Sequence, residues 1–428
     1  MKILIVTYES WRDTNSGGNV LSNLFRAFPE ADIAHIYCWG ELPQNAICRK
    51  YFQISDLMLL TKEKGRRLTE RDYSRDVENR QGDAENRIKR GIPGVLKNAS
   101  LLARELMWEV FNWRTKELEC FVKDFKPDVI FAPCDTSYHV LKLTLYVKSI
   151  AQCPMISYVV DDIYSYKRLR FYPSFWINKT ITRKWMRRFF AECSLVYTMT
   201  EMQKNEYESI FKRPMKILCK SADFEEQEKE TGNPIRFLYA GNLYVNRWKT
   251  LIGLSDALAA VNASGLRAQL HIFSGTKLNA RTLRKLNDGR NAIFHGLISY
   301  QELEKWYRRS DVAVFAESFD LKNRLITRLS FSTKIIDCLS SGCAVLAVGP
   351  GKQAGMAYLK DNDAAICVGS IRDLKPTIRR IVDHPELITE YSRKANQLGK
   401  KNHMRADIEQ KLRQDFYEIA SENERCFS

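Results

Sequence analysis

Short apolar runs alternate along the chain with longer segments in which hydrophobic residues recur every three or four positions. One series lies at 2–7, 31–37, 128–132, 155–160 and 194–199, and a second at 235–240, 270–274, 292–295, 311–316, 344–348 and 364–368. Runs this short and apolar, separated by amphipathic segments, are typical of parallel strands covered by helices on both faces. The two series predict an α/β protein with two doubly wound, Rossmann-like domains facing across a cleft.

A polar, acidic stretch separates the two series and ends in Gly-Asn-Pro at residues 232–234, as a linker does. The chain of 428 residues is also too long for one ordinary core. We therefore predict a first domain over 1–222 and a second over 223–404. The last helical pattern, at about 405–428, is expected to complete the first domain; its apolar face carries Ile408, Leu412, Phe416 and Ile419.

Residues 61–115 lack the strand pattern and are predicted to form a charged, partly helical insertion in the first domain. Within them, residues 61–91 hold ten Lys/Arg and seven Asp/Glu with few aromatic residues. This composition is typical of a solvated loop.

Composition excludes several classes of protein. Apolar residues make up 45% of the chain, but none of their runs approaches the roughly twenty that a membrane span needs. The first strand begins directly after Met1, without the apolar core and cleavage site of a signal peptide. The eleven cysteines are scattered without a C-x-x-C pair, which favours reduced core thiols over a zinc site or disulfides. We expect a cytoplasmic protein, either free or peripheral at the inner face of the plasma membrane.

The formal net charge of +16 points to an acidic partner, which could be nucleic acid, anionic lipid or a phosphorylated small molecule. The basic residues form no recognisable nucleic-acid-binding module, so we expect no nucleic-acid partner.

Positive charge is concentrated at 161–190, where eight Lys/Arg face two acids. An apolar stripe there is predicted at spacings of four, over Ile177, Ile181, Trp185 and Phe189. Such a helix either contacts an anionic membrane through 165–190 or packs its stripe on the sheet and shows its charges to water. In the second case the charged face could still steer an isoprenoid diphosphate acceptor.

The segment S-F-S-T-K-I-I-D-C-L-S-S-G at 330–342 carries the strongest candidate chemistry. It predicts a helix capped by Ser332 and ended by Gly342. Lys334 and Asp337 then point away from its apolar stripe, together. The helix follows a strand, so its N-terminus would offer N–H groups to a phosphate beside Lys334, and Asp337 could accept from ribose hydroxyls. The alternative is a surface pair worth a few tenths of a kcal/mol.

Two further glycine-containing loops follow strands. The stretch Y-A-G-N-L-Y-V-N-R-W-K-T-L at 239–251 places Gly241 before Arg247 and Lys249, and N-S-G-G-N at 15–19 contains Gly17 and Gly18. Neither loop has the spacing of a dinucleotide fingerprint or a P-loop. Together with 330–342, however, both lie where open α/β sheets bind ligands.

Taken together, these motifs resemble those of the GT-B glycosyltransferases, specifically the retaining family 4 type. The start M-K-I-L-I-V-T followed by S-G-G-N-V, and the stretch L-V-Y-T-M-T-E-M at 195–202, are similar to that family's first domain. Its pair of acids resembles Glu317 and Asp337, separated here by an insertion. S-T-K at 332–334 looks like the Pro-Ser-Lys helix start of bacterial capsule and surface-polysaccharide relatives.

The resemblance implies a UDP- or GDP-sugar donor and no other cofactor. It implies that Asp337 binds ribose, that Glu317 lies by the donor sugar and that the Gly17–Gly18 loop touches the diphosphate. Ser332 and Thr333 begin the donor-binding helix. We hypothesise that Arg247 and Lys334 stabilise the charge of the leaving diphosphate without a metal, since no Asp-x-Asp-like ligand set is recognisable.

The sequence departs from the family pattern at two places. Asn242 stands where the family has Arg and Arg247 where it has Lys, so Lys249, Lys322 or Arg324 would have to supply the missing cation. In V-V-D-D-I at 159–163, Asp161 replaces a His; Asp161 and Asp162 are the candidates for contact with the donor or acceptor sugar.

The resemblance predicts a glycosyltransferase that moves a sugar, with retention, to a saccharide or isoprenoid-diphosphate-linked acceptor in surface polysaccharide assembly. Two alternatives keep the fold. A catalytically silent partner subunit would explain Asn242 and the displaced acids. A nucleotide-sugar epimerase would need a histidine at the sugar, for which His271 and His295 lie near strand ends.

Overall fold

The computed structural model describes residues 1–68, 94–225 and 229–427. Contacts divide the chain into two compact units: unit 1 is Met1–Leu218 with the chain from Glu409 onward, and unit 2 is Cys219–Ile408. The chain thus enters unit 2 at Cys219 and returns to unit 1 at Glu409; the bounds 1–222 and 223–404 stay a prediction.

Unit 1 is built on an eight-stranded sheet in the order β4-β3-β2-β1-β5-β6-β7-β8, parallel except for the β3–β4 pair. The expected strands are confirmed, while the short edge strands β3, β4 and β8 were not predicted. The strands are β1 (Lys2–Glu9), β2 (Asp32–Trp39), β3 (Lys50–Gln53), β4 (Arg66–Arg67), β5 (Val129–Pro133), β6 (Met155–Val159), β7 (Leu195–Thr198) and β8 (Met215–Ile217).

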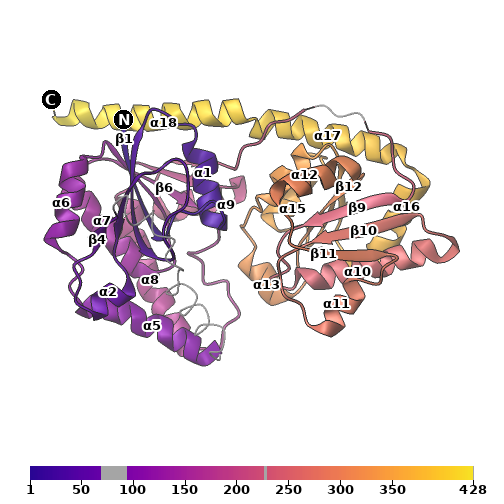
Figure 1. The fold of residues 1–428 in the computed structure, drawn as a ribbon, viewed down its shortest axis with the longest axis horizontal. Helices are drawn as coiled ribbons and strands as arrows, with labels where there is room; N and C mark the ends of the chain where they lie inside the picture. Colours follow the sequence, from indigo (N-terminus) through magenta and orange to yellow (C-terminus); the bar gives the residue numbers. More distant parts are fainter. Residues whose placement is uncertain (69–93, 226–228, 428) are drawn as a thin grey trace. The chain divides into compact units, whose positions relative to one another are not determined.

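Helices cover both faces of this sheet (Figure 1). On one face α6, α7 and α8 pack in sequence, and α5 packs against α7 and α8. On the other, Phe416 of α18 packs against Phe25 of α1 and Phe131 of β5. The helices are α1 (Ser16–Phe25), α2 (Asp56–Leu60), α5 (Gly94–Val110), α6 (Lys116–Phe125), α7 (Tyr138–Ala151), α8 (Pro173–Ala191), α9 (Glu201–Phe211) and α18 (Arg405–Phe427).

The predicted apolar stripe of α8 is correct at Phe189, which is buried, and wrong at Ile177. Its buried side chains are Thr182, Met186, Phe189 and Phe190, whereas Ile177 is 53% exposed. At 3.6 residues per turn, each step of four overshoots a full turn by roughly 40°, so three steps carry the stripe about 120° around the helix. Residues at strict spacings of four therefore cannot all face one sheet.

Unit 2 is built on a six-stranded parallel sheet in the order β11-β10-β9-β12-β13-β14. All six expected strands are confirmed: β9 (Ile235–Ala240), β10 (Ala268–Phe273), β11 (Ala292–Gly296), β12 (Val312–Ala316), β13 (Ala344–Val348) and β14 (Ile366–Val368). The two sheets confirm the predicted fold class of two doubly wound domains.

The helices of unit 2 also lie on both faces of their sheet (Figure 1). Helices α10 and α11 pack together and α16 packs on α10, while α17 packs on α14 and β13. The helices are α10 (Arg247–Val261), α11 (Ala280–Leu286), α12 (Tyr300–Arg309), α13 (Leu321–Ile326), α14 (Lys334–Ser340), α15 (Ala354–Asp361), α16 (Leu374–Asp383) and α17 (Glu386–His403).

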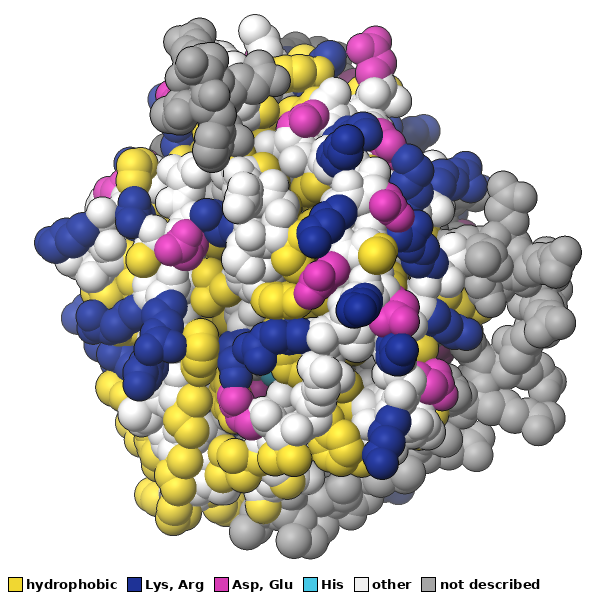
Figure 2. Space-filling model, turned by 90° about the vertical axis from the view of Figure 1, so that its left-hand side faces the viewer, with side chains coloured by type: hydrophobic (Ala, Val, Ile, Leu, Met, Phe, Trp, Pro, Cys, Tyr) yellow, Lys and Arg dark blue, Asp and Glu magenta, His cyan; other side chains and the backbone are white. Residues whose placement is uncertain are grey.

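Residues 69–93 of the predicted insertion lie outside the described residues; the rest of 61–115 includes β4 and α5. On the face of the molecule shown in Figure 2, Lys and Arg side chains form several groups interleaved with hydrophobic and acidic ones. Across the described chain, no helix combines the length and apolarity needed to cross a bilayer.

Candidate functional site

The candidate site in unit 2 forms where β9 and β12 end. These strands are neighbours in the parallel sheet, so the residues that follow them meet at one edge. Gly241 follows β9 and Glu317 follows β12. Helix α10 then begins at Arg247 and α14 at Lys334, which adds two cations to the same edge.

Gly241 and Lys334 are in close contact. A Cβ atom placed on Gly241 would lie 1.7 Å from Cε of Lys334 and 2.8 Å from its Nζ. Gly241 also has a φ of +156°, which L side chains rarely adopt. The position therefore requires glycine, and the lysine side chain crosses the backbone where a ligand would approach it.

Arg247 joins the two strand ends. Its Nη2 donates to Oε1 of Glu317 at 2.8 Å, and its Nη1 donates to Oδ1 of Asn242 at 3.1 Å. The side chains of Arg247 and Glu317 are 15% and 7% exposed. Oε2 of Glu317 is buried and accepts no hydrogen bond from any described residue. Asn242 thus helps to orient the arginine five residues later.

The Lys334 ammonium donates to no acceptor within the described parts of the chain. Burial and then the nearby charge of Arg247 lower the pKa of Lys334. A phosphate group between the two side chains would supply the missing negative charge and acceptor oxygens. The structure thus brings together Gly241, Asn242, Arg247, Glu317 and Lys334, five of the residues predicted for the donor site.

Asp337 is already paired. Its Oδ1 accepts from Nζ of Lys220 at 2.7 Å, and both side chains are partly exposed. A ribose hydroxyl would have to share or replace this bond. Sequence reasoning missed Lys220, because it lies 117 positions away in a segment interpreted as the end of the first domain.

The start of α14 differs from the predicted cap. Thr333, in a helical conformation, precedes the first helical residue and makes no side-chain cap bond. Oγ of Ser332 instead accepts from the backbone N–H of Lys334 at 3.4 Å, one position earlier than an N-cap would lie. Gly342, with a φ of +69°, ends the helical segment as predicted.

Lys249 points to another acid. Its Nζ lies 3.1 and 3.2 Å from the carboxylate oxygens of Asp320, which also accepts from Asn246 at 2.6 Å. This ion pair is half-exposed. Lys249 is thus held by Asp320 next to the cluster formed by Arg247 and Glu317.

The Gly17–Gly18 segment of unit 1 is helical rather than a loop, since α1 already begins at Ser16. Oδ1 of Asn15 caps the helix by accepting from the N–H of Gly18 at 2.6 Å. A Cβ on Gly18 would lie 2.0 Å from the carbonyl oxygen of Arg12, whereas Gly17 is exposed. Close packing thus explains Gly18, and Gly17 remains open to a ligand.

The two aspartates after β6 differ in exposure. Asp162 is fully buried, and its carboxylate accepts from the N–H and hydroxyl of Ser165 at 3.2 and 2.7 Å. Asp161 is exposed and its carbonyl oxygen accepts from Gln203. Asp162 therefore shapes the loop, and of the two only Asp161 is open to a sugar.

The histidines considered for an epimerase bind each other. Nδ1 of His271 lies 3.0 Å from Nε2 of His295, and both rings pack against Trp306. Burial lowers the pKa of His271 to about 4. This pair has its own partners and forms no hydrogen bond with the residues around Arg247. Across residues 1–68, 94–225 and 229–427, no group of three His, Cys, Asp or Glu is arranged to hold a metal ion.

Comparisons with known proteins found a match to the part of the chain that contains this site. Residues 234–384, most of unit 2, match the family model described as group 1 glycosyl transferases. A search of curated proteins returned no significant match.

Solved structures match the whole chain at low identity. They include HepE from Anabaena in complex with UDP-glucose, at 13% identity and a TM-score of 0.61, covering 98% of this chain and 100% of that one. Sucrose-phosphate synthase from Thermosynechococcus elongatus matches at 12% identity and a TM-score of 0.61, and the match covers 98% of this chain and 99% of that one. TarM of S. aureus matches at 9% identity and a TM-score of 0.62, and the match covers 97% of this chain and 98% of that one. The fold is therefore that of GT-B glycosyltransferases.

Proposed function

We propose that this chain is a glycosyltransferase that binds a UDP-sugar in unit 2 and transfers its sugar to a saccharide or lipid-linked saccharide acceptor. The observation that carries the proposal is the convergence of Arg247, Lys334 and Gly241 at the carboxyl ends of β9 and β12. The match of residues 234–384 to the group 1 family supports it. UDP is preferred to GDP because structures of similar fold contain UDP or UDP-glucose.

The transfer breaks the bond between the sugar's anomeric carbon and the phosphate oxygen, and the bonding electrons remain on UDP. Arg247 and Lys334 would stabilise that added charge, since both are preorganised and partly removed from water. An acceptor hydroxyl forms the new bond to the anomeric carbon and passes its proton to the leaving phosphate. Glu317, with one buried oxygen unpartnered, would lie beside the donor sugar.

We further propose retention of anomeric configuration and a role in surface polysaccharide assembly at the inner face of the membrane. These rest on the resemblance of Glu317, Asp337 and the S-T-K helix start to the retaining family 4 type. Gly17 and Asp161, both exposed in unit 1, remain the proposed contacts to the diphosphate and the sugar there.

A thermal-shift panel tests the donor site. Wild type, Arg247→Ala, Asp337→Ala and the control Arg284→Ala, an exposed position on α11, are melted with UDP, GDP, ADP and their sugars. A ligand at 100 times its Kd stabilises by about 2.7 kcal/mol. We expect UDP to stabilise wild type and Arg284→Ala, and to lose most of that effect in the other two variants.

Each variant is compared with its own unliganded melting temperature, which separates binding from the instability that loss of Arg247 causes by exposing Glu317. If no nucleotide stabilises wild type, the proposal fails. The pairing of Asp337 with Lys220 would then favour a catalytically silent partner subunit.

A further inference from the structure

A pocket of about 360 Å³ in unit 1 lies between α5 and α8, against the loops that follow β5 and β6. Ser137 and Ile163 contribute from those loops. The strand order reverses between β1 and β5, since successive strands extend from β1 in one direction and from β5 in the other. Open α/β sheets bind ligands at such a switch point, outside the carboxyl ends of the strands.

Four cationic side chains line this pocket: Arg104, Arg168, Arg170 and Lys179. The acid that lines it, Glu105, is already engaged, because it accepts from Arg104 at 3.3 Å and from the backbone N–H of His139 at 3.0 Å. Arg104 also donates to the hydroxyls of Tyr8 and Ser137. The cations that line the pocket therefore outnumber the acid, and Arg104 is held in place by its hydrogen bonds.

Two of the cations have no carboxylate within ion-pair distance in the described chain. Lys179 donates to the carbonyl oxygen of Ile163, and the Arg170 guanidinium lies 5.8 Å from the centroid of the Phe175 ring. Burial and the charge of Arg168 lower the pKa of Lys179, and the charge of the buried Asp162 raises it. The carboxylate of Asp162, however, accepts its hydrogen bonds from Ser165. A ligand with several anionic oxygens would supply the acceptors that these cations lack.

Exposed apolar side chains adjoin the cations in sequence. Leu169 and Phe171 flank Arg170 and are 40% and 91% exposed, and Ile177, on the first turns of α8, is 53% exposed. A group of exposed apolar side chains, unlike a single one, is typical of an interaction site. Cationic and apolar groups thus alternate along one short stretch beside the pocket.

We propose that this pocket binds the diphosphate of a lipid-linked acceptor, with the first carbons of the lipid over Leu169 and Phe171. A diphosphate matches several cations better than a single carboxylate does, and the apolar side chains match a hydrocarbon chain. That the ligand is the acceptor rests on the glycosyltransferase function proposed above; the diphosphate site itself does not.

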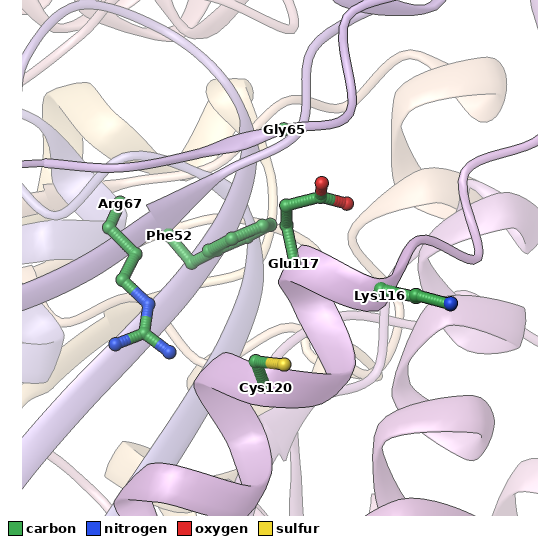
Figure 3. A pocket seen from close by; sticks show the side chains of 6 residues that line it. All are labelled: Phe52, Gly65, Arg67, Lys116, Glu117 and Cys120. Carbon is green, nitrogen blue, oxygen red and sulfur yellow. The ribbon is translucent and has the colours of Figure 1, made fainter.

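The hollow shown in Figure 3, at α6 and β4, is unlike this pocket. Its Arg67 is paired with Asp124, and its Glu117 lies 3.5 Å from Lys64. Cys120 is exposed there on α6. Because Arg67 and Glu117 are already paired, and Lys116 is the remaining cation among the residues that line it, this hollow offers less positive charge to an anion than the pocket with four cations.

Isothermal titration calorimetry of the full chain tests the proposal, with UDP added first to fill the donor site. The probes are pyrophosphate, geranyl diphosphate and geraniol. We expect geranyl diphosphate to bind at one site and pyrophosphate to bind there more weakly, with no heat from geraniol. Arg170→Gln and Lys179→Gln should each lower the affinity for geranyl diphosphate and for pyrophosphate about tenfold or more, because each removes a charge-assisted hydrogen bond.

Two control variants separate the parts of the site. Lys184→Gln, at an exposed position of α8 outside the pocket, should change binding less than twofold. Phe171→Ser should lower the affinity for geranyl diphosphate several-fold and leave the affinity for pyrophosphate unchanged. Equal binding of the two phosphates would overturn the lipid part of the proposal. No phosphate binding beyond the donor site, or binding that neither Arg170→Gln nor Lys179→Gln alters, would overturn it entirely.

The two proposals fail separately. If UDP does not bind wild type, the donor site is removed with Arg247→Ala and the phosphate titrations are repeated on that variant. Binding that persists there and is lost on adding Lys179→Gln would keep the diphosphate site without the transferase. Unchanged melting temperatures of the unit 1 variants exclude unfolding as the cause of any loss.

Discussion

The donor cluster of unit 2 and the basic pocket of unit 1 both lie at the carboxyl ends of parallel strands, but they are assembled differently. Arg247, at the start of the helix that follows β9, and Glu317, directly after the adjacent β12, form an ion pair, so their charges partly cancel. In the second site Arg104 on a helix is paired with Glu105, but Arg170 in a loop and Lys179 on another helix have no carboxylate within ion-pair distance among the described residues. The first site is therefore preorganised before a ligand binds, whereas the second depends on the ligand to balance its charge.

The largest effect that separates the sites should come from Gly241→Ala. The new Cβ would displace the Lys334 side chain, so we expect UDP affinity to fall about 100-fold, measured by calorimetry. Gly265→Ala is the matched control, because Gly265 has nearly the same φ, +153°, but nothing within 4 Å of its Cβ position. Both variants should lose stability, by about 1–3 kcal/mol of backbone strain. Only Gly241→Ala should also lose affinity for UDP.

If both glycine variants bound UDP equally well, Lys334 would have no part in donor binding. Geranyl diphosphate binding in unit 1 should be unchanged in either variant, which makes it an internal check that the rest of the chain is folded.

Lys334→Met should have opposite effects on stability and binding. Its ammonium is crowded by Arg247 and donates to no acceptor among the described residues, so a neutral side chain should raise the unfolding free energy by about 0.5–1 kcal/mol. UDP affinity should fall roughly tenfold or more as one charged contact is lost. Chemical denaturation and calorimetry measure the two quantities. A loss of stability would instead assign Lys334 a structural role.

The different predictability of the two sites follows from how each is built. Alternating short apolar runs were enough to predict the strands of unit 2. Gly241 and Glu317 directly follow two of these strands, and Lys334 lies at the start of the predicted helix, whereas Arg247 was expected in a loop and begins α10. The unit 1 pocket could not be predicted in the same way. It depends on how α5, which carries Arg104, packs beside α8, and sequence periodicity does not specify packing between helices. Edge strands such as β8 were missed because three residues carry too little periodicity.

The α8 stripe shows the same limit. Spacings of four in sequence suggested a buried face that runs from Ile177 to Phe189, but in the structure Thr182, Met186 and Phe190 are buried together with Phe189 where α8 packs against α5 and α7. That rotation leaves Ile177 exposed beside the basic pocket. The error in the predicted face is thus the reason that the exposure of Ile177 could not be predicted.

A smaller difference between the two sites should appear when ligand affinity is measured as a function of pH. Burial and the neighbouring charge of Arg168 lower the pKa of Lys179 from 10.5 to about 8. As pH rises through 8 in the unliganded protein, Lys179 loses its proton, so geranyl diphosphate affinity should fall several-fold between pH 7 and 9. The other groups that act on Lys179 are Arg183, Asp162 and Cys134; Arg104 and Glu105 line the same pocket.

In Lys179→Gln the affinity should be lower at pH 7 and nearly flat from pH 7 to 9, measured by the same titration. An equally steep fall in this variant would assign the pH dependence to another group. UDP binding to wild type provides the comparison, because neither Lys179 nor its neighbours contribute to unit 2.

The smallest effect should come from Lys249→Gln. Lys249 lies only two residues from Arg247, but its ammonium is paired with Asp320 and is half-exposed. Exposed pairs of this kind contribute about 0.2–1 kcal/mol, so stability should change by less than that and UDP affinity by less than twofold. A tenfold loss of UDP, measured by calorimetry, would instead make Lys249 the cation that replaces the family arginine at Asn242. The donor cluster would then extend across Asp320, and its charge excess would resemble that of the unit 1 pocket.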